Sequence, residues 1–200
     1  MKSLTLLGLG TLVLAGATTA YAQGAAAPPA AAPGSAPMVE LKVGDKAPNF
    51  KLQGTDGKTH NLADYAGKQA VVVAWFPAAF TQGCTIECKS LAENGHLIEK
   101  YNAKYFMVSV DPLEGDKGNI AFAKEHGGNK FPLLSDPTKD VANEYGVLNT
   151  ERGFANRWTF YIDKTGKISA IDKDVSKRLA TSAEDMAAML KQLGVEEKKK

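Results

Sequence analysis

The feature that most constrains the fold is an unbroken apolar run from Ala70 to Phe76. It contains three consecutive valines, which favour extended backbone, and no polar residue interrupts it. A strand with one face in water alternates apolar and polar residues, whereas a strand buried on both faces does not. The run therefore predicts a central strand of a sheet that other elements cover on both sides.

The segments around this run alternate between strand and helix patterns. An Asp56-Gly57 turn predicts a hairpin over residues 49–62. Helical patterns follow at 84–101, 117–126, 138–145 and 182–193, and strand patterns at 105–110, 157–162 and 167–171. In the first helix, Ile86, Leu91, Leu97 and Ile98 can share an apolar face. This order predicts an α/β fold with a central mixed sheet, helices on both faces and an N-terminal β-hairpin.

The first 38 residues are expected to lie outside this domain. Lys2 precedes an apolar stretch, and Ala20 and Ala22 form a small-x-small cleavage site. This is the layout of a secretory signal peptide, so we expect residues 1–22 to be removed, with an uncleaved anchor as the alternative. Residues 23–38 are rich in Ala, Pro and Gly, which predicts a flexible linker. We therefore expect an exported, periplasmic or secreted protein, with a folded domain at 39–195, a charged tail at 196–200 and no stable membrane association after cleavage.

The charge balance argues against nucleic acid as a partner. The chain carries 24 basic and 22 acidic residues, a net charge of +2, whereas a phosphate-binding surface needs a basic excess. The three histidines are spread along the chain without the spacing of metal ligands. We therefore expect neither a metal nor an organic cofactor.

The chain has two cysteines, Cys84 and Cys88, which lie four residues apart. A disulfide that closes so short a loop stabilises a fold little, so local chemistry is the better interpretation. Cys84 follows the central strand and Pro77, and the pattern predicts that it begins a helix. A thiol in the first turn of a helix meets free N–H groups and the positive end of the helix dipole, which favour the nucleophilic thiolate. Thr81 can place a hydroxyl beside the sulfur.

Four segments together resemble the peroxiredoxin family. The motif Pro77-x-x-x-Thr81-x-x-Cys84 matches the active-site motif of that family, and the segment from Arg157 to Asp163 is similar to its second signature. The segments 43–50 and 131–147 resemble its opening and middle. The match spans about 43–171 and is most similar to the bacterioferritin-comigratory, or Q-type, branch of the AhpC/TSA-like proteins. The resemblance implies a thioredoxin-like three-layer sandwich and a monomer.

The resemblance also implies an activity and the residues that perform it. Cys84 would attack hydrogen peroxide or an organic hydroperoxide and become a sulfenic acid. Thr81 would hydrogen-bond the peroxide, and Arg157 would hold the thiolate and polarise the O–O bond. Pro77 would shield the site from water, and Glu87 would orient Arg157. A thioredoxin-like protein or another thiol would supply the electrons.

Cys88 departs from the family pattern, because a resolving cysteine in this helix usually lies five residues after the first, not four. On a helix, Cβ atoms four residues apart are roughly 5–6 Å from each other. A disulfide needs Cβ atoms roughly 3.5–4.5 Å apart. We hypothesise that Cys88 resolves the sulfenic acid of Cys84 after one turn of the helix unwinds.

Three other functions fit parts of the sequence. The Cys84-x-x-x-Cys88 spacing also occurs in copper-delivery proteins of the Sco type, where two thiolates bind Cu(I). Those proteins add a histidine near the late strand, whereas this chain has Arg157 there. A thiol–disulfide oxidoreductase would normally use a Cys-x-x-Cys pair. A redox-inactive binding module would leave the combination of Pro77, Thr81, Cys84 and Arg157 unexplained.

Overall fold

The computed structural model describes residues 40–127 and 130–198. The predicted signal peptide at 1–22 and the predicted linker at 23–38 lie outside the described residues, as do the last two residues of the predicted charged tail. Those assignments stay predictions.

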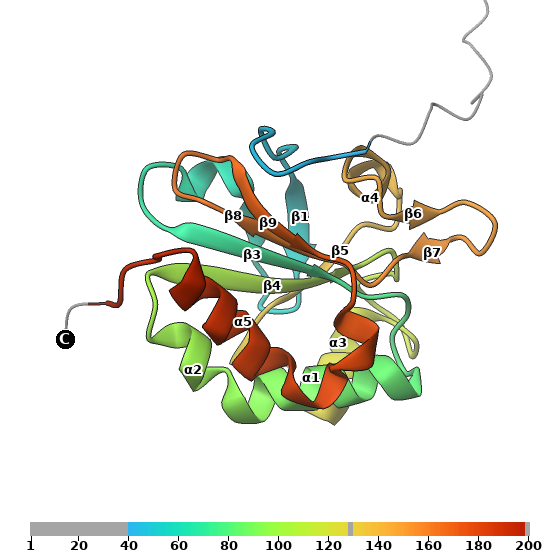
Figure 1. Ribbon diagram of the computed structural model, residues 1–200. Coiled ribbons are helices and arrows are strands. Elements are labelled where there is room, and N and C mark those ends of the chain that lie inside the picture. Colours follow the sequence, from blue (N-terminus) through green and yellow to red (C-terminus); the bar gives the residue numbers. More distant parts are fainter. Residues whose placement is uncertain (1–39, 128–129, 199–200) are drawn as a thin grey trace, which may run out of the picture. The chain divides into compact units, whose positions relative to one another are not determined.

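A mixed sheet of seven strands, in the order β2-β1-β5-β4-β3-β8-β9, forms the centre of the described domain (Figure 1). The strands are β1 (Lys51–Gly54), β2 (Thr59–Asn61), β3 (Ala70–Trp75), β4 (Ala103–Ser109), β5 (Leu133–Ser135), β8 (Thr159–Ile162) and β9 (Ile168–Asp172). Strands β3, β4 and β5 are parallel, and β8 runs antiparallel to β3. The β1–β2 pair is the predicted N-terminal hairpin. All six residues of β3 are buried, which confirms the predicted central strand.

Helices cover both faces of the sheet and give the expected three-layer α/β sandwich (Figure 1). One face packs against α1 (Gln82–Asn94), α2 (His96–Glu99), α3 (Asn119–His126) and α5 (Ser182–Gln192). The other face packs against α4 (Asp140–Glu144), the 3-10 turn η1 (Leu62–Tyr65) and the segment before β1. Among the described residues, no helix has the length and apolar character needed to cross a membrane.

The first predicted helix differs from the observed one in two ways. It begins at Gln82 and is interrupted at Gly95, where a Cβ would overlap the hydroxyl of Tyr105. Ile86 does not join the apolar face, since 38% of its surface is exposed. Cys84, Glu87, Cys88 and Leu91 face the sheet instead. The hydropathy pattern did not predict this buried face because the face includes the charged residue Glu87.

Several short elements were not predicted from the sequence. Strand β5 has three residues, and β6 (Leu148–Asn149) and β7 (Phe154–Ala155) have two each, too few to show a period. Strand β5 is held by its neighbours: it pairs with β4 on one side and β1 on the other. Its strand conformation therefore comes from tertiary contacts.

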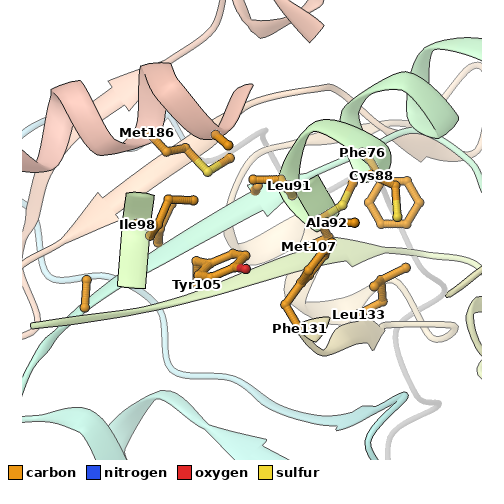
Figure 2. Close-up of a cluster of buried hydrophobic side chains, with 14 of the residues drawn as sticks. Phe76, Cys88, Leu91, Ala92, Ile98, Tyr105, Met107, Phe131, Leu133 and Met186 are labelled. Carbon is orange, nitrogen blue, oxygen red and sulfur yellow. The ribbon is translucent and has the colours of Figure 1, made fainter. Parts of the chain in front are cut away.

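The core on the α1 side of the sheet is apolar and densely filled (Figure 2). Phe76, Leu91, Met107 and Leu133 are fully buried in it. Cys88 lies among them (Figure 2), and Cys84 belongs to the same buried cluster.

Candidate active site

The sheet topology brings two distant segments together at the carboxyl end of β3. Because β8 is antiparallel to β3, the start of β8 lies beside the end of β3, with Ala74 opposite Thr159. The Trp75 N–H donates a hydrogen bond of 2.9 Å to the Trp158 carbonyl and extends this pairing. Arg157 precedes β8, and α1 begins shortly after β3 ends. The start of α1 and the Arg157 side chain therefore meet at one edge of the sheet.

The loop from Pro77 to Thr81 connects β3 to α1. The Ala79 N–H donates a 2.8 Å hydrogen bond to Oδ2 of Asp111, which follows β4. Phe80 has a φ of 61°, in the left-handed region that non-glycine residues seldom adopt. Thr81 has an extended conformation and is the N-cap residue of α1; its carbonyl accepts a 2.9 Å hydrogen bond from the Thr85 N–H. The loop conformation thus sets where the first turn of α1 begins.

Cys84 is the third residue of α1 and is completely buried. Nη2 of Arg157 donates a hydrogen bond of 3.0 Å to its Sγ. A fixed cation beside a sulfur favours the thiolate over the thiol, as does a position in the first turn of a helix. The thiolate is the nucleophilic form. The site therefore joins a sulfur and a guanidinium, as the resemblance implied.

Glu87 lies one turn after Cys84, and its Oε2 accepts a hydrogen bond from Nη1 of Arg157. Burial raises the pKa of Glu87 to about 7, although the Arg157 charge lowers it. Burial lowers the pKa of Arg157, but Glu87 and Cys84 raise it and prevail, so Arg157 stays charged. The Oε1 atom of Glu87 has no hydrogen-bond partner among the described residues. Glu87 therefore holds one end of the guanidinium while Cys84 accepts from the other.

The two remaining predicted residues lie in the loop before α1. Pro77 directly follows Phe76 and is half-buried. The Thr81 hydroxyl is exposed and donates a 3.0 Å hydrogen bond to the Ala78 carbonyl. Both residues are at the site, and their roles in shielding the sulfur and binding peroxide stay predictions.

Cys88 occupies a different environment from Cys84. Its thiol is fully buried, beside the labelled Phe76 in Figure 2, and donates a 3.8 Å hydrogen bond to the His126 carbonyl at the end of α3. Burial, together with the smaller effects of the Glu87 and Cys84 charges, raises the pKa of Cys88 to about 12. Both cysteines are free in this structure. In this conformation Cys88 is a protonated core thiol.

Sequence reasoning missed three residues at this site. Asp111 anchors the loop, and Gly83 has both Leu179 and Arg157 beside it. Gly83 carried a detectable signal, because glycine is unfavourable inside a helix. Leu179 and Asp111 carried none, since neither belongs to a motif or a periodic pattern. Among residues 40–127 and 130–198, no group of three or more His, Cys, Asp or Glu side chains is placed to hold a metal ion.

Comparison with known proteins places this site in a family. Residues 43–171 match the model of the AhpC/TSA family. The chain is 36% identical over 132 residues to the chloroplastic 2-Cys peroxiredoxin BAS1 of Hordeum vulgare, an alignment that covers 63% of each chain. It is 35% identical over 130 residues to alkyl hydroperoxide reductase E of Mycobacterium tuberculosis, covering 64% of this chain and 82% of that protein. The chain thus spans less than two thirds of the length of the barley relative.

Two solved structures have the same fold. Peroxidoxin BcpB from Mycobacterium tuberculosis superposes with a TM-score of 0.67 at 27% identity, covering 76% of this chain and 98% of that one. A mutant of PrxQ from Xylella fastidiosa gives a TM-score of 0.64 at 25% identity, covering 78% of this chain and 99% of that one. Both match nearly their whole length, so the likeness extends over the entire domain.

Proposed function

Because this chain belongs to the AhpC/TSA family of peroxiredoxins, in its bacterioferritin-comigratory or Q-type branch, we propose that it is a thiol-dependent peroxidase. Its substrate is hydrogen peroxide or an organic hydroperoxide, and Cys84 is the peroxidatic cysteine. The observation that supports this most strongly is the 3.0 Å contact from Nη2 of Arg157 to Sγ of Cys84. It places a positive charge and a hydrogen-bond donor beside the sulfur, and a cation there favours the thiolate.

The reaction begins when the Cys84 thiolate attacks the terminal oxygen of the hydroperoxide. An S–O bond forms and the O–O bond breaks, so sulfur loses two electrons and becomes a sulfenic acid. The departing oxygen leaves as alkoxide or hydroxide and takes a proton from solvent to become an alcohol or water. Arg157 can donate toward the oxygen on which negative charge develops, which lowers the barrier. Because Cys84 is fully buried, residues around it must shift to admit the peroxide.

The second step joins Cys84 to Cys88. The Cys88 sulfur displaces hydroxide from the sulfenic acid, and its proton completes one water as the disulfide forms. In the described conformation Cys88 is buried and donates to the His126 carbonyl, so the first turns of α1 must unwind before the sulfurs meet. A thioredoxin-like protein or another dithiol then reduces the disulfide. If Cys88 does not resolve, an external thiol attacks the sulfenic acid directly.

The location of the reaction follows from the N-terminal sequence. Residues 1–22 have the layout of a signal peptide, and residues 23–38 have the composition of a linker. The protein therefore works after export, in the periplasm or outside the cell, without stable membrane association. The resemblance to the Q-type branch favours a monomer. Its reductant is a thiol protein of that compartment.

Copper delivery is the main alternative, and two observations disfavour it. The family match extends over residues 43–171 and is to peroxiredoxins. The Arg157 guanidinium donates to Cys84, and a fixed positive charge there opposes Cu(I) binding.

Peroxide consumption by the purified protein tests the proposal, with dithiothreitol as the electron donor. The wild type should consume peroxide catalytically, and Cys84→Ser should not. Without dithiothreitol, one equivalent of peroxide should leave Cys84 of Cys88→Ser as a sulfenic acid, visible by mass spectrometry. Equal peroxide consumption by the wild type and Cys84→Ser would overturn the assignment.

A further inference from the structure

Residues 173–181 connect β9 to α5 and run past the start of α1 (Figure 1). This segment, called the strap below, consists largely of two 3-10 turns, η3 (Val175–Lys177) and η4 (Leu179–Thr181). The family match ends at residue 171, just before it. None of the six predicted site residues lies in the strap.

The strap is fixed to the domain at three points. The Lys173 ammonium lies 4.3 Å from the centre of the Trp158 ring, next to Arg157 in the chain. Val175 is 5% exposed. The Arg178 guanidinium donates to Asp172 at 2.7 Å and to Asp185 at 2.8 Å. It therefore links the last residue of β9 to the first turn of α5. The position of the residue that follows Arg178 is therefore well defined.

That residue, Leu179, lies beside Gly83, as does the active-site arginine. A Cβ added to Gly83 would lie 3.2 Å from Cδ1 of Leu179 and 3.3 Å from Nη2 of Arg157. Both contacts are tighter than ordinary carbon contacts of roughly 3.5–4.0 Å. The leucine methyl and the guanidinium thus border the same small space above Gly83. This guanidinium nitrogen is the one that donates to the Cys84 sulfur.

We propose that Leu179 is a positioning residue that, with Gly83, holds the Arg157 guanidinium against the Cys84 sulfur; its effect on turnover rests on the proposed function. Glu87 fixes Nη1, but a single hydrogen bond leaves the guanidinium free to swing about that contact. Leu179 occupies part of the space above Gly83 that Nη2 also borders, and so restricts movement of Nη2 into that space. Glycine at position 83 leaves this space open, because an alanine methyl there would press on both Leu179 and Arg157.

A double-mutant cycle tests this role. Leu179→Ala should lower the rate of Cys84 oxidation by peroxide by about 10- to 100-fold, the loss expected when a reacting geometry is displaced by about 1 Å. On an Arg157→Ala background the same change should cost less than about twofold, because the group it positions is gone. Leu179→Met should recover most of the rate. Leu97→Ala, at another half-buried leucine on α2, is the matched control and should leave the rate unchanged.

Equal losses on both backgrounds, or no loss from Leu179→Ala, would overturn the proposal. If Leu179→Ala does not fold, by circular dichroism, Gly83→Ala tests the same space from the other side. Its loss of rate should likewise disappear on the Arg157→Ala background, and a loss that persists there would overturn the proposal.

The cycle is repeated with iodoacetamide in place of peroxide, on a Cys88→Ser background. Alkylation needs a reactive thiolate but no peroxide, so it tests the positioning role of Leu179 independently of the peroxidase function. A wild type that consumes no peroxide but shows the coupling in alkylation would refute the proposed function and support the positioning role. If the protein consumes peroxide but the effects of Leu179→Ala and Arg157→Ala are additive in both reactions, the proposed function stands and the positioning role of Leu179 is refuted.

Discussion

Arg157 and Cys84 are 73 residues apart in the chain, yet Nη2 of the arginine lies 3.0 Å from Sγ of the cysteine. The contact depends on the antiparallel pairing of β8 with β3, which sets Arg157 beside the turn that leads into α1. The same guanidinium donates to Glu87 through its other terminal nitrogen. One cation thus contacts two groups of the same helix, and both can carry negative charge.

The two cysteines should differ sharply in reactivity. Burial raises the pKa of Cys88 to about 12, so almost none of it is thiolate at pH 7.5. Iodoacetamide at pH 7.5 should therefore label Cys84 of the reduced, folded protein and leave Cys88 unmodified. Peptide mass spectrometry measures this, and the same reaction in 6 M guanidinium chloride, which should label both thiols, is the control. Equal labelling of both cysteines in the folded protein would contradict the structure.

Glu87 should make the stability of the protein depend on pH. Its pKa is about 7 in the folded state against an ordinary value of 4.5, so between these values the folded state holds a proton that the unfolded state has lost. Stability from this group is complete below pH 4.5 and is lost as the pH rises through about 7. Glu87→Gln should remove this part of the pH dependence of the free energy of unfolding, because glutamine does not titrate.

Urea unfolding of the wild type and Glu87→Gln at pH 5 and pH 8 measures the effect. The variant should gain stability relative to the wild type on going from pH 5 to pH 8. Glu93→Gln, at an exposed position of the same helix, should follow the wild type. A constant difference between the wild type and Glu87→Gln at the two pH values would show that Glu87 does not titrate in this range.

Asp111 should matter to the site although it does not touch the sulfur. Its Oδ2 accepts a hydrogen bond from the Ala79 N–H and holds the loop that sets the start of α1. Asp111→Ala should lower the rate of Cys84 oxidation about tenfold, through loss of a hydrogen bond worth about 1.5 kcal/mol. Asp111→Asn retains an acceptor oxygen and should recover part of the rate. Stopped-flow oxidation measures both, with exposed Asp116→Ala as the control; a rate for Asp111→Ala equal to that of the control would contradict this role.

The parts of the fold with strong local patterns were predictable. The valine-rich β3 had no polar interruption, and the β1–β2 hairpin had an Asp-Gly turn. Motifs whose spacing is characteristic of a family indicated the helix that carries Cys84 and the position of Arg157, although that helix begins at Gln82, two residues earlier than predicted. Each of these signals lies within a few consecutive residues.

The rest depends on contacts between distant segments. Strand β5 is strand because β1 and β4 flank it, and Ile86 is exposed because Glu87 takes the buried position opposite Arg157. Leu179 lies beside Gly83 in a segment that Arg178 links to Asp172 and Asp185. No local pattern encodes such pairings, so they appear only in the three-dimensional structure.

The most direct test of the account is the rate at which one equivalent of peroxide oxidises Cys84 in the wild type and in Arg157→Ala. If the guanidinium stabilises the thiolate and the departing oxygen, the rate should fall by about 10²- to 10³-fold, the loss expected for one preorganised donor. Arg152→Ala, at an exposed arginine in the turn before β7, should oxidise at the wild-type rate. A folded Arg157→Ala variant that reacts as fast as the wild type would contradict the account.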